Sequence, residues 1–174
     1  WLIYALGGGL GHLTRTLSLA RTALRGDPAI HVDLITNCSY LDADALQVEM
    51  GPRFQPHWLR ADIGKARTVE RVCELLYRIP FDTLVVDTFP RGLGGELGKL
   101  LPRISRTKVL IQRDLTPEYA ERASVQTAIQ HYQLVLVPGE SVDHIRHAKV
   151  VQTEPWLFRE SDELPSAEIA ARKL

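Results

Sequence analysis

Short apolar runs alternate along the chain with stretches of helical periodicity. The apolar runs, bounded by turn residues, cover 2–6, 30–36, 54–59, 83–86, 108–112, 134–137 and 148–152. Between them, hydrophobic positions recur at helical spacing over 13–24, 41–50, 65–79, 93–101 and 116–132. Strands alternating with helices predict a Rossmann-like α/β fold, a parallel sheet of six to seven strands with helices on both faces.

The pattern weakens after the last predicted strand. We expect residues 1–153 to form one domain and residues 154–174 to form a linker or terminal segment that leads towards a second domain. Trp156 and Phe158 are expected to pack this segment against the domain, or to form an apolar dock for a missing partner. Because Trp1 already lies in a predicted strand, the natural start of the protein is expected to lie upstream.

The first predicted strand runs into a glycine-rich turn, residues 7–11, that ends on His12. Glycine permits backbone conformations closed to other residues and lets a ligand approach closely. The dinucleotide pattern G-x-G-x-x-G fails here, because it needs glycine at His12 or at Thr14. The following helix presents unpaired N–H groups, so this loop and His12 are expected to face whatever binds outside the strand ends.

Charged residues follow two later strands. Asp87 and Arg91 come after the run 83–86, and Arg113 and Asp114 come after the run 108–112. The two arginines and Asp114 either hold acceptor hydroxyls or phosphate, or are merely solvated or paired. Asp87 either takes part in catalysis or caps the next helix.

Composition narrows the classes of function. The chain has 174 residues, 21 basic and 21 acidic, so it lacks the positive field expected of a nucleic-acid-binding protein. No apolar run is long enough to predict a transmembrane segment, and two cysteines without metal spacing suit a reducing cytoplasm. No metal is expected, since His144 and His147, three residues apart, have no evident third ligand.

Three segments together resemble the amino-terminal half of GT-B glycosyltransferases. They are the loop from Gly7 to Arg15, the segment Val85-Val86-Asp87-Thr88-Phe89-Pro90-Arg91-Gly92, and Val137-Pro138-Gly139. The glycine-histidine loop is most similar to that of bacterial enzymes related to the N-acetylglucosaminyltransferase of peptidoglycan synthesis. The resemblance implies one Rossmann-like half of a GT-B fold, which mainly binds the acceptor and pairs with a carboxyl-terminal donor-binding domain or subunit.

The resemblance also implies a chemistry and a set of site residues. The substrates would be an acceptor and a nucleotide-sugar such as a UDP-sugar, with no further cofactor. His12 would be the base of an inverting transfer and Asp87 would hold its other ring nitrogen. The expected substrate-binding residues are those of the loop and of the strand ends: Gly8, Gly9, Gly11, Thr14, Arg91, Arg113 and Asp114.

Three hypotheses for the function remain open at this point. The first is the acceptor-side domain of an inverting glycosyltransferase, which is expected to be weak or inactive as an isolated chain. The second is a sugar- or nucleotide-binding module without chemistry. The third is a GT-B-fold epimerase that acts on the nucleotide-sugar itself. His12 also has a purely structural interpretation, as a loop histidine that stabilises the turn.

Overall fold

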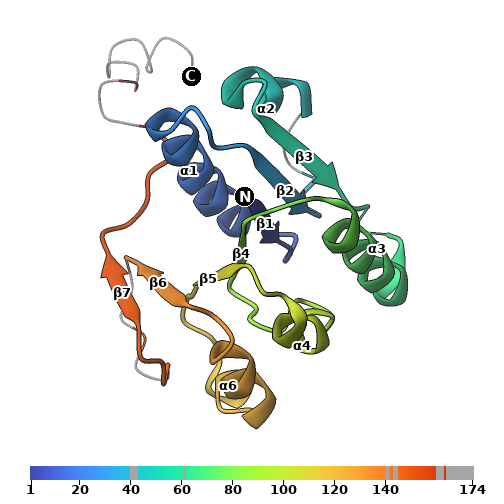
Figure 1. Ribbon diagram of the computed structural model, residues 1–174, viewed down its shortest axis with the longest axis vertical. Coiled ribbons are helices and arrows are strands. Elements are labelled where there is room, and N and C mark those ends of the chain that lie inside the picture. The colour runs from blue at the N-terminus through green and yellow to red at the C-terminus, as the bar shows by residue number, and fades with distance from the viewer. Residues whose placement is uncertain (40–42, 61, 140–141, 143–144, 160–162, 164–174) are drawn as a thin grey trace, which may run out of the picture.

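A computed structural model describes residues 1–39, 43–60, 62–139, 142, 145–159 and 163. The strands of this part form one parallel sheet in the order β3-β2-β1-β4-β5-β6-β7 (Figure 1). Their bounds are β1 Leu2–Ala5, β2 Val32–Thr36, β3 Phe54–Trp58, β4 Thr83–Asp87, β5 Thr107–Ile111, β6 Leu134–Pro138 and β7 Val150–Thr153. The predicted parallel sheet of six to seven strands is therefore confirmed.

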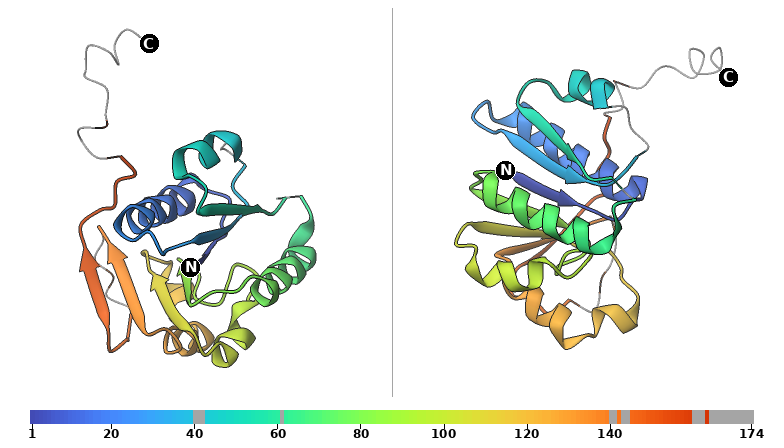
Figure 2. Two further views of the ribbon diagram at one scale, coloured as in Figure 1. Left: turned by 45° about the horizontal axis from the view of Figure 1, so that its top comes forward. Right: turned by 90° about the vertical axis from the view of Figure 1, so that its right-hand side faces the viewer.

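Helices cover both faces of the sheet. Their bounds are α1 Leu10–Gly26, α2 Ala43–Met50, α3 Gly64–Arg78, α4 Leu97–Leu100, the 3-10 turn η1 Leu101–Arg103, α5 Pro117–Ala120 and α6 Ala123–Ile129. One core cluster joins α1 and α2 to one face, and a second joins α3, α4 and α6 to the other (Figure 2). The central strands are buried on both sides, which explains their continuous apolar sequence.

The strand order contains a switch point between β1 and β4. From β1 the chain winds outward through β2 to β3, then crosses back to β4 and winds in the other direction to β7. In open parallel sheets, ligands bind outside the carboxyl ends of the strands at such a switch point. The glycine loop follows β1 and Asp87 ends β4, so the fold places both at this position.

Two predicted helices differ from the structure. The helix expected over 93–101 is the short helix α4, because Gly92 and Gly95 at φ +79° and +90° hold the preceding segment in turns. The helix expected over 116–132 is broken into α5 and α6, since Arg122 is extended at ψ 126°. The Gln126 side chain donates to the Ala120 carbonyl at 2.8 Å and satisfies the broken end.

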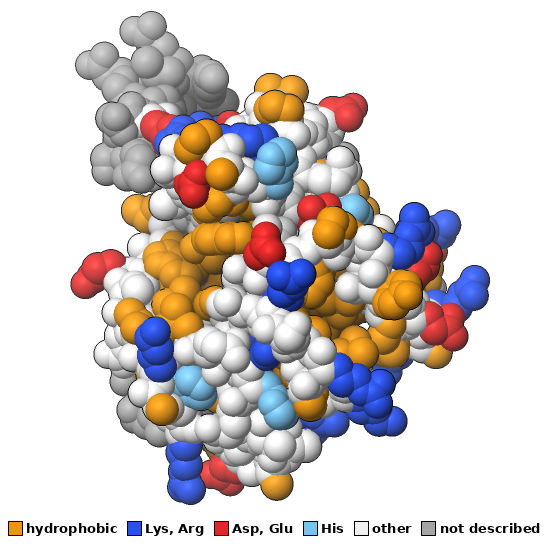
Figure 3. Space-filling model, in the orientation of Figure 1, with side chains coloured by type: hydrophobic (Ala, Val, Ile, Leu, Met, Phe, Trp, Pro, Cys, Tyr) orange, Lys and Arg blue, Asp and Glu red, His pale blue; other side chains and the backbone are white. Residues whose placement is uncertain are grey.

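The segment after β7 packs back on α1. Ser18 Oγ donates to the Leu157 carbonyl at 2.6 Å, and Arg21 donates to the Phe158 carbonyl at 2.9 Å. Trp156 and Phe158 are partly buried against the core of the α1 face, as predicted. Figure 3 shows hydrophobic side chains gathered in a hollow between α1 and strands β6 and β7, and Val151 of β7 is 42% exposed.

Candidate active site

His12 and Asp87 meet at the switch point of the sheet. His12 lies in the first turn of α1, and Asp87 is the last residue of β4, the strand beside β1. The His12 Nδ1 atom lies 2.6 Å from Asp87 Oδ2. Asp87 is fully buried, whereas 19% of the His12 side chain is exposed. A carboxylate that accepts the Nδ1 proton leaves a lone pair on Nε2, which is the arrangement required of a general base.

The imidazole of His12 rests on Gly7. A Cβ atom at Gly7 would lie 2.3 Å from His12 Nε2, so only glycine fits beneath the ring. The loop is also anchored, because Asn37 Oδ1 accepts hydrogen bonds from the N–H groups of Gly7 and Gly8, both at 3.0 Å. The first glycine of the loop thus makes room for the histidine, whereas the sequence suggested room for a ligand.

Arg15 is a third member of the site. Its Nε atom donates to Asp87 Oδ1 and its Nη2 atom donates to Asp87 Oδ2, each at 2.8 Å. This bidentate pair fixes the carboxylate and offsets its charge, so Asp87 sets the tautomer and orientation of His12 more than it supplies a free negative charge. Arg15 is not among the site residues expected from the sequence. The available signal was its position three residues after His12, on the same helix face.

The turn after β4 completes the surroundings. Thr88 has φ +65°, a left-handed conformation that is uncommon for a β-branched residue. Its hydroxyl donates to Asp87 Oδ2 at 3.0 Å and accepts from Arg15 at 3.1 Å. The Phe89 ring centroid lies 5.6 Å from that of His12.

Asp87 caps no described helix. Its side-chain partners are His12, Arg15 and Thr88, and the N-cap of the next helix, α4, is Glu96. The alternative interpretation of Asp87 as a helix cap was therefore wrong.

The remaining predicted residues of the loop lie around this centre. Gly9 is the N-cap of α1, and Gly11 is exposed in its first turn. Arg113 comes close to Gly11, because a Cβ there would lie 3.7 Å from the Arg113 guanidinium. Thr14 is exposed and its hydroxyl donates to the Leu10 carbonyl at 3.0 Å.

The charged strand-end residues do not all gather at His12. Asp114 is exposed in the segment after β5. Arg91 lies elsewhere, in a cavity between α4 and α6, so the structure does not bring it together with His12 and Asp87. The predicted role of these residues in substrate binding stays a prediction.

A cavity of about 290 Å³ opens beside the glycine loop. Its lining comes from the end of β2, the start of α3 and the turn after β4: Asn37, Gly64, Lys65, Thr68, Val69, Leu93 and Gly94. Asn37 connects the cavity to the loop, since the same side chain holds Gly7 and Gly8. The lining offers an ammonium, a hydroxyl and an amide beside apolar side chains, which suits a small polyhydroxylated or ring-shaped ligand.

A buried Tyr4–Glu96 pair shapes the turn that lines this cavity. The Tyr4 hydroxyl donates to Glu96 Oε1 at 2.5 Å and accepts from the Leu93 N–H at 2.7 Å, and the Gly94 N–H donates to Glu96 Oε2 at 2.8 Å. Burial, and then the Glu96 carboxylate, raise the pKa of Tyr4 far above its usual value. Gly92 is required here, because a Cβ at this position would lie 2.6 Å from the Glu96 carboxyl carbon.

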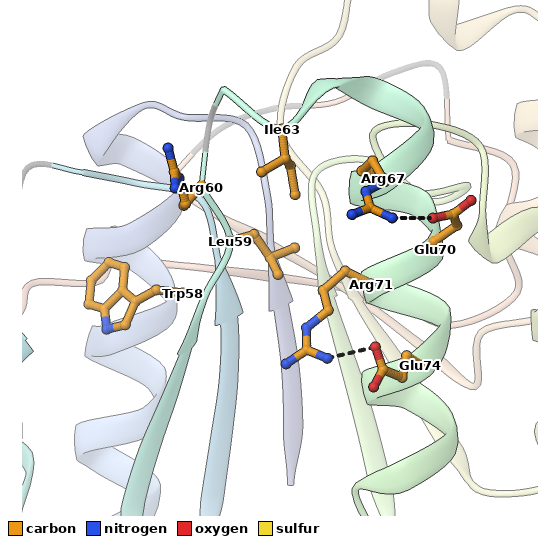
Figure 4. Close-up of a pocket in the computed structure, with 8 residues that line it drawn as sticks. All are labelled: Trp58, Leu59, Arg60, Ile63, Arg67, Glu70, Arg71 and Glu74. Atoms are coloured by element: carbon orange, nitrogen blue, oxygen red, sulfur yellow. Dashed lines mark hydrogen bonds and ion pairs between the residues drawn. The ribbon is translucent and has the colours of Figure 1, made fainter.

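A second cavity, of about 360 Å³, lies between the end of β3 and α3 (Figure 4). Its arginines face acidic partners: Arg71 lies 2.6 Å from Glu74, and Arg67 lies 3.9 Å from Glu70. Arg60, at its rim, lies 2.6 Å from Asp62. The cavity is therefore close to charge-balanced.

The described ranges contain neither a metal-binding cluster nor a membrane-spanning helix. Within these ranges, no group of three or more His, Cys, Asp or Glu side chains could hold a metal ion. His144 lies outside the described residues, so the expectation that it and His147 bind no metal stays a prediction. No described helix has both the length and the apolar character needed to cross a bilayer.

Comparison with solved structures supports the fold assignment. The chain is similar to UGT2 of Phytolacca americana complexed with UDP-2fluoro-glucose and pterostilbene, with a TM-score of 0.55 at 10% identity over 98% of this chain. It is also similar to apo UGT2, with a TM-score of 0.55 at 11% identity over 92% of this chain. The matches cover 56% and 53% of the UGT2 chains, so this chain spans about half their length. No family model and no curated protein matches the sequence.

At this level of identity the similarity is one of fold. It agrees with the expected Rossmann-like α/β architecture. The relationship to the bacterial peptidoglycan branch and the assignment to an amino-terminal half stay predictions.

Proposed function

We propose that this chain is the acceptor-side half of an inverting glycosyltransferase, in which His12 is the general base. The observation that carries the proposal is the 2.6 Å contact between His12 Nδ1 and buried Asp87, at the switch point of the sheet. The fold similarity to a protein solved with UDP-2fluoro-glucose supports a nucleotide-sugar as donor. The donor would bind mainly to a second, carboxyl-terminal half.

The reaction follows from the free lone pair on Nε2. An acceptor hydroxyl gives its proton to Nε2 as its oxygen forms a bond to the anomeric carbon of the sugar. The bond between that carbon and the nucleotide diphosphate oxygen breaks, and the diphosphate leaves with the electron pair. Asp87 stabilises the imidazolium that forms, and Arg15 keeps Asp87 in place.

The acceptor is expected to occupy the 290 Å³ cavity beside the glycine loop. Asn37 belongs both to that cavity and to the anchor of the loop, so a ligand there reaches the neighbourhood of His12. Lys65 and Thr68 can bind acceptor hydroxyls, and Val69 and Leu93 can contact its apolar faces.

The test is transfer by the complete enzyme, with both halves present. His12→Ala is expected to lower turnover by about 10²-fold or more, the usual contribution of a general base. His31→Ala, in the exposed loop before β2, is the matched control and should retain full activity. Near-normal turnover of His12→Ala would overturn the proposal.

The same assay separates the other two hypotheses. An epimerase converts the nucleotide-sugar when no acceptor is added, which the proposed enzyme does not do. A binding module retains ligand without forming any product, whether or not His12 is present.

A further inference from the structure

Arg91 lies in a cavity whose charge is unbalanced. The cavity, of about 270 Å³, opens between α4 and α6 and is lined by Arg91, Gly95, Gly98, Lys99, Ser124, Thr127, Ala128 and His131. We call it the basic pocket. Two cations and an imidazole face it, and none of its described lining residues is acidic. The cavity between the end of β3 and α3 differs, because its arginines face glutamates (Figure 4).

Arg91 is partly buried where it lines this pocket. No described residue accepts a hydrogen bond from it or forms an ion pair with it. Glu96, in the same loop, is instead bonded to Tyr4 and to the Gly94 N–H. A partly desolvated guanidinium without an acceptor is unfavourable unless something else supplies one.

Two glycines leave room for this side chain. A Cβ at Gly98 would lie 3.4 Å from Arg91 Nε, and a Cβ at Gly95 would lie 3.8 Å from Arg91 Nη2. Gly95 also has φ +90°, which L side chains rarely adopt. No side chain at Gly95 or Gly98 therefore separates the Arg91 guanidinium from the backbone at the start of α4.

The donors suit an anion with several oxygens. Arg91 offers a planar fork and Lys99 an ammonium, and the Ser124 hydroxyl has no acceptor among the described residues. Thr127 contributes less, because its hydroxyl already donates to the Ala123 carbonyl at 2.8 Å. A phosphate group, with up to two negative charges and three terminal oxygens, satisfies these donors better than a carboxylate does.

We propose that the basic pocket binds the dianion of a phosphate monoester, at a site separate from His12 and Asp87. Its volume lies just below the range of about 300–1,000 Å³ typical of pockets that enclose a whole ligand. The phosphate therefore enters the pocket and the rest of the molecule stays outside. A phosphorylated small metabolite and the headgroup of phosphatidic acid both present this group.

The binding test is a titration of the isotope-labelled chain with inorganic phosphate, followed by amide NMR at constant ionic strength. We expect saturable shifts at Gly95, Gly98 and Ser124. Arg91→Gln should weaken binding by about tenfold or more, since it removes a charge-assisted bidentate contact. Arg103→Gln, an exposed arginine outside the pocket, removes the same charge and should bind as the parent does.

Further variants separate this proposal from the proposed function. His12→Ala must leave phosphate binding unchanged, because the two sites share no residue. If Arg91→Gln does not fold, Lys99→Gln, whose side chain is exposed, provides the same comparison. Shifts that do not saturate, or equal affinities in the pocket variants and in Arg103→Gln, would overturn the proposal.

The source of the phosphate is resolved by two further ligands. Glycerol 3-phosphate represents the small metabolites, and vesicles containing phosphatidic acid, compared with pure phosphatidylcholine vesicles, represent the headgroups. Binding of the former alone assigns the pocket to a soluble ligand. Sedimentation with the acidic vesicles that Arg91→Gln abolishes assigns it to a membrane surface. If neither ligand binds, the monoester assignment is wrong.

Discussion

His12 and Asp87, 75 residues apart in the chain, meet with Nδ1 and Oδ2 separated by 2.6 Å. The contact forms because β1 and β4 are neighbours in the sheet although two other strands lie between them in sequence. It joins a histidine in the first turn of α1 and an aspartate at the end of β4 into a pair that fixes the orientation of the imidazole.

Asp87→Asn tests the role of the carboxylate in the complete enzyme. The amide keeps the shape of the side chain but loses the charge that stabilises the imidazolium and binds Arg15. We expect turnover to fall by about 10²-fold or more, as for loss of general-base function. The control is Asp33→Asn, which alters a second His–Asp pair, with His57 at 2.7 Å, on strands β2 and β3. If both variants lose activity equally, the loss in Asp87→Asn does not come from the His12–Asp87 pair, and the proposed role of this carboxylate is wrong.

Gly7→Ala tests the position of the imidazole without changing any polar group. The added methyl would meet His12 Nε2 at 2.3 Å, so the ring must move away from its place against the loop. We expect transfer activity close to that of His12→Ala. Gly26→Ala adds the same methyl where nothing lies within 4 Å, and should leave activity unchanged. A fully active Gly7→Ala variant would show that the ring position is not required.

Arg15→Met tests stability and not only activity. It leaves the fully buried Asp87 carboxylate with His12 and Thr88 as its remaining side-chain partners. We expect the free energy of unfolding, measured by urea denaturation, to fall by about 3 kcal/mol, the lower end for loss of one partner of a buried ion pair. Arg60→Met, which breaks an exposed pair with Asp62, should have no measurable effect.

Tyr4 predicts a loss of stability in alkali. Burial and the Glu96 carboxylate raise its pKa in the folded state, so above about pH 10 the unfolded chain loses a proton that the folded chain keeps. This contribution is complete below pH 10 and decreases by about 1.4 kcal/mol per pH unit above it. Urea unfolding at a series of alkaline pH values should show a shallower fall for Tyr4→Phe. Tyr77→Phe, 91% exposed, should follow the parent protein.

Several features could be predicted because they depend on local sequence. Apolar runs bounded by turn residues determine which segments are buried strands, and their alternation with amphipathic helices determines a parallel α/β sheet. The position of His12 at the start of a helix after a glycine loop is equally local. Helix boundaries were less accurate where glycines with positive φ and an extended Arg122 interrupt the periodicity.

The sequence by itself determined the fold class, the edge of the sheet where chemistry is expected, and His12 as a candidate base. Only the tertiary structure decided which side chains surround that histidine: it placed Asp87 on the ring nitrogen where the resemblance implied it, added Arg15, and placed Arg91 between α4 and α6 instead. The physical reason is that periodicity reports the burial of each segment, whereas strand order and loop geometry set the contacts between segments. Those contacts depend on packing across the whole sheet.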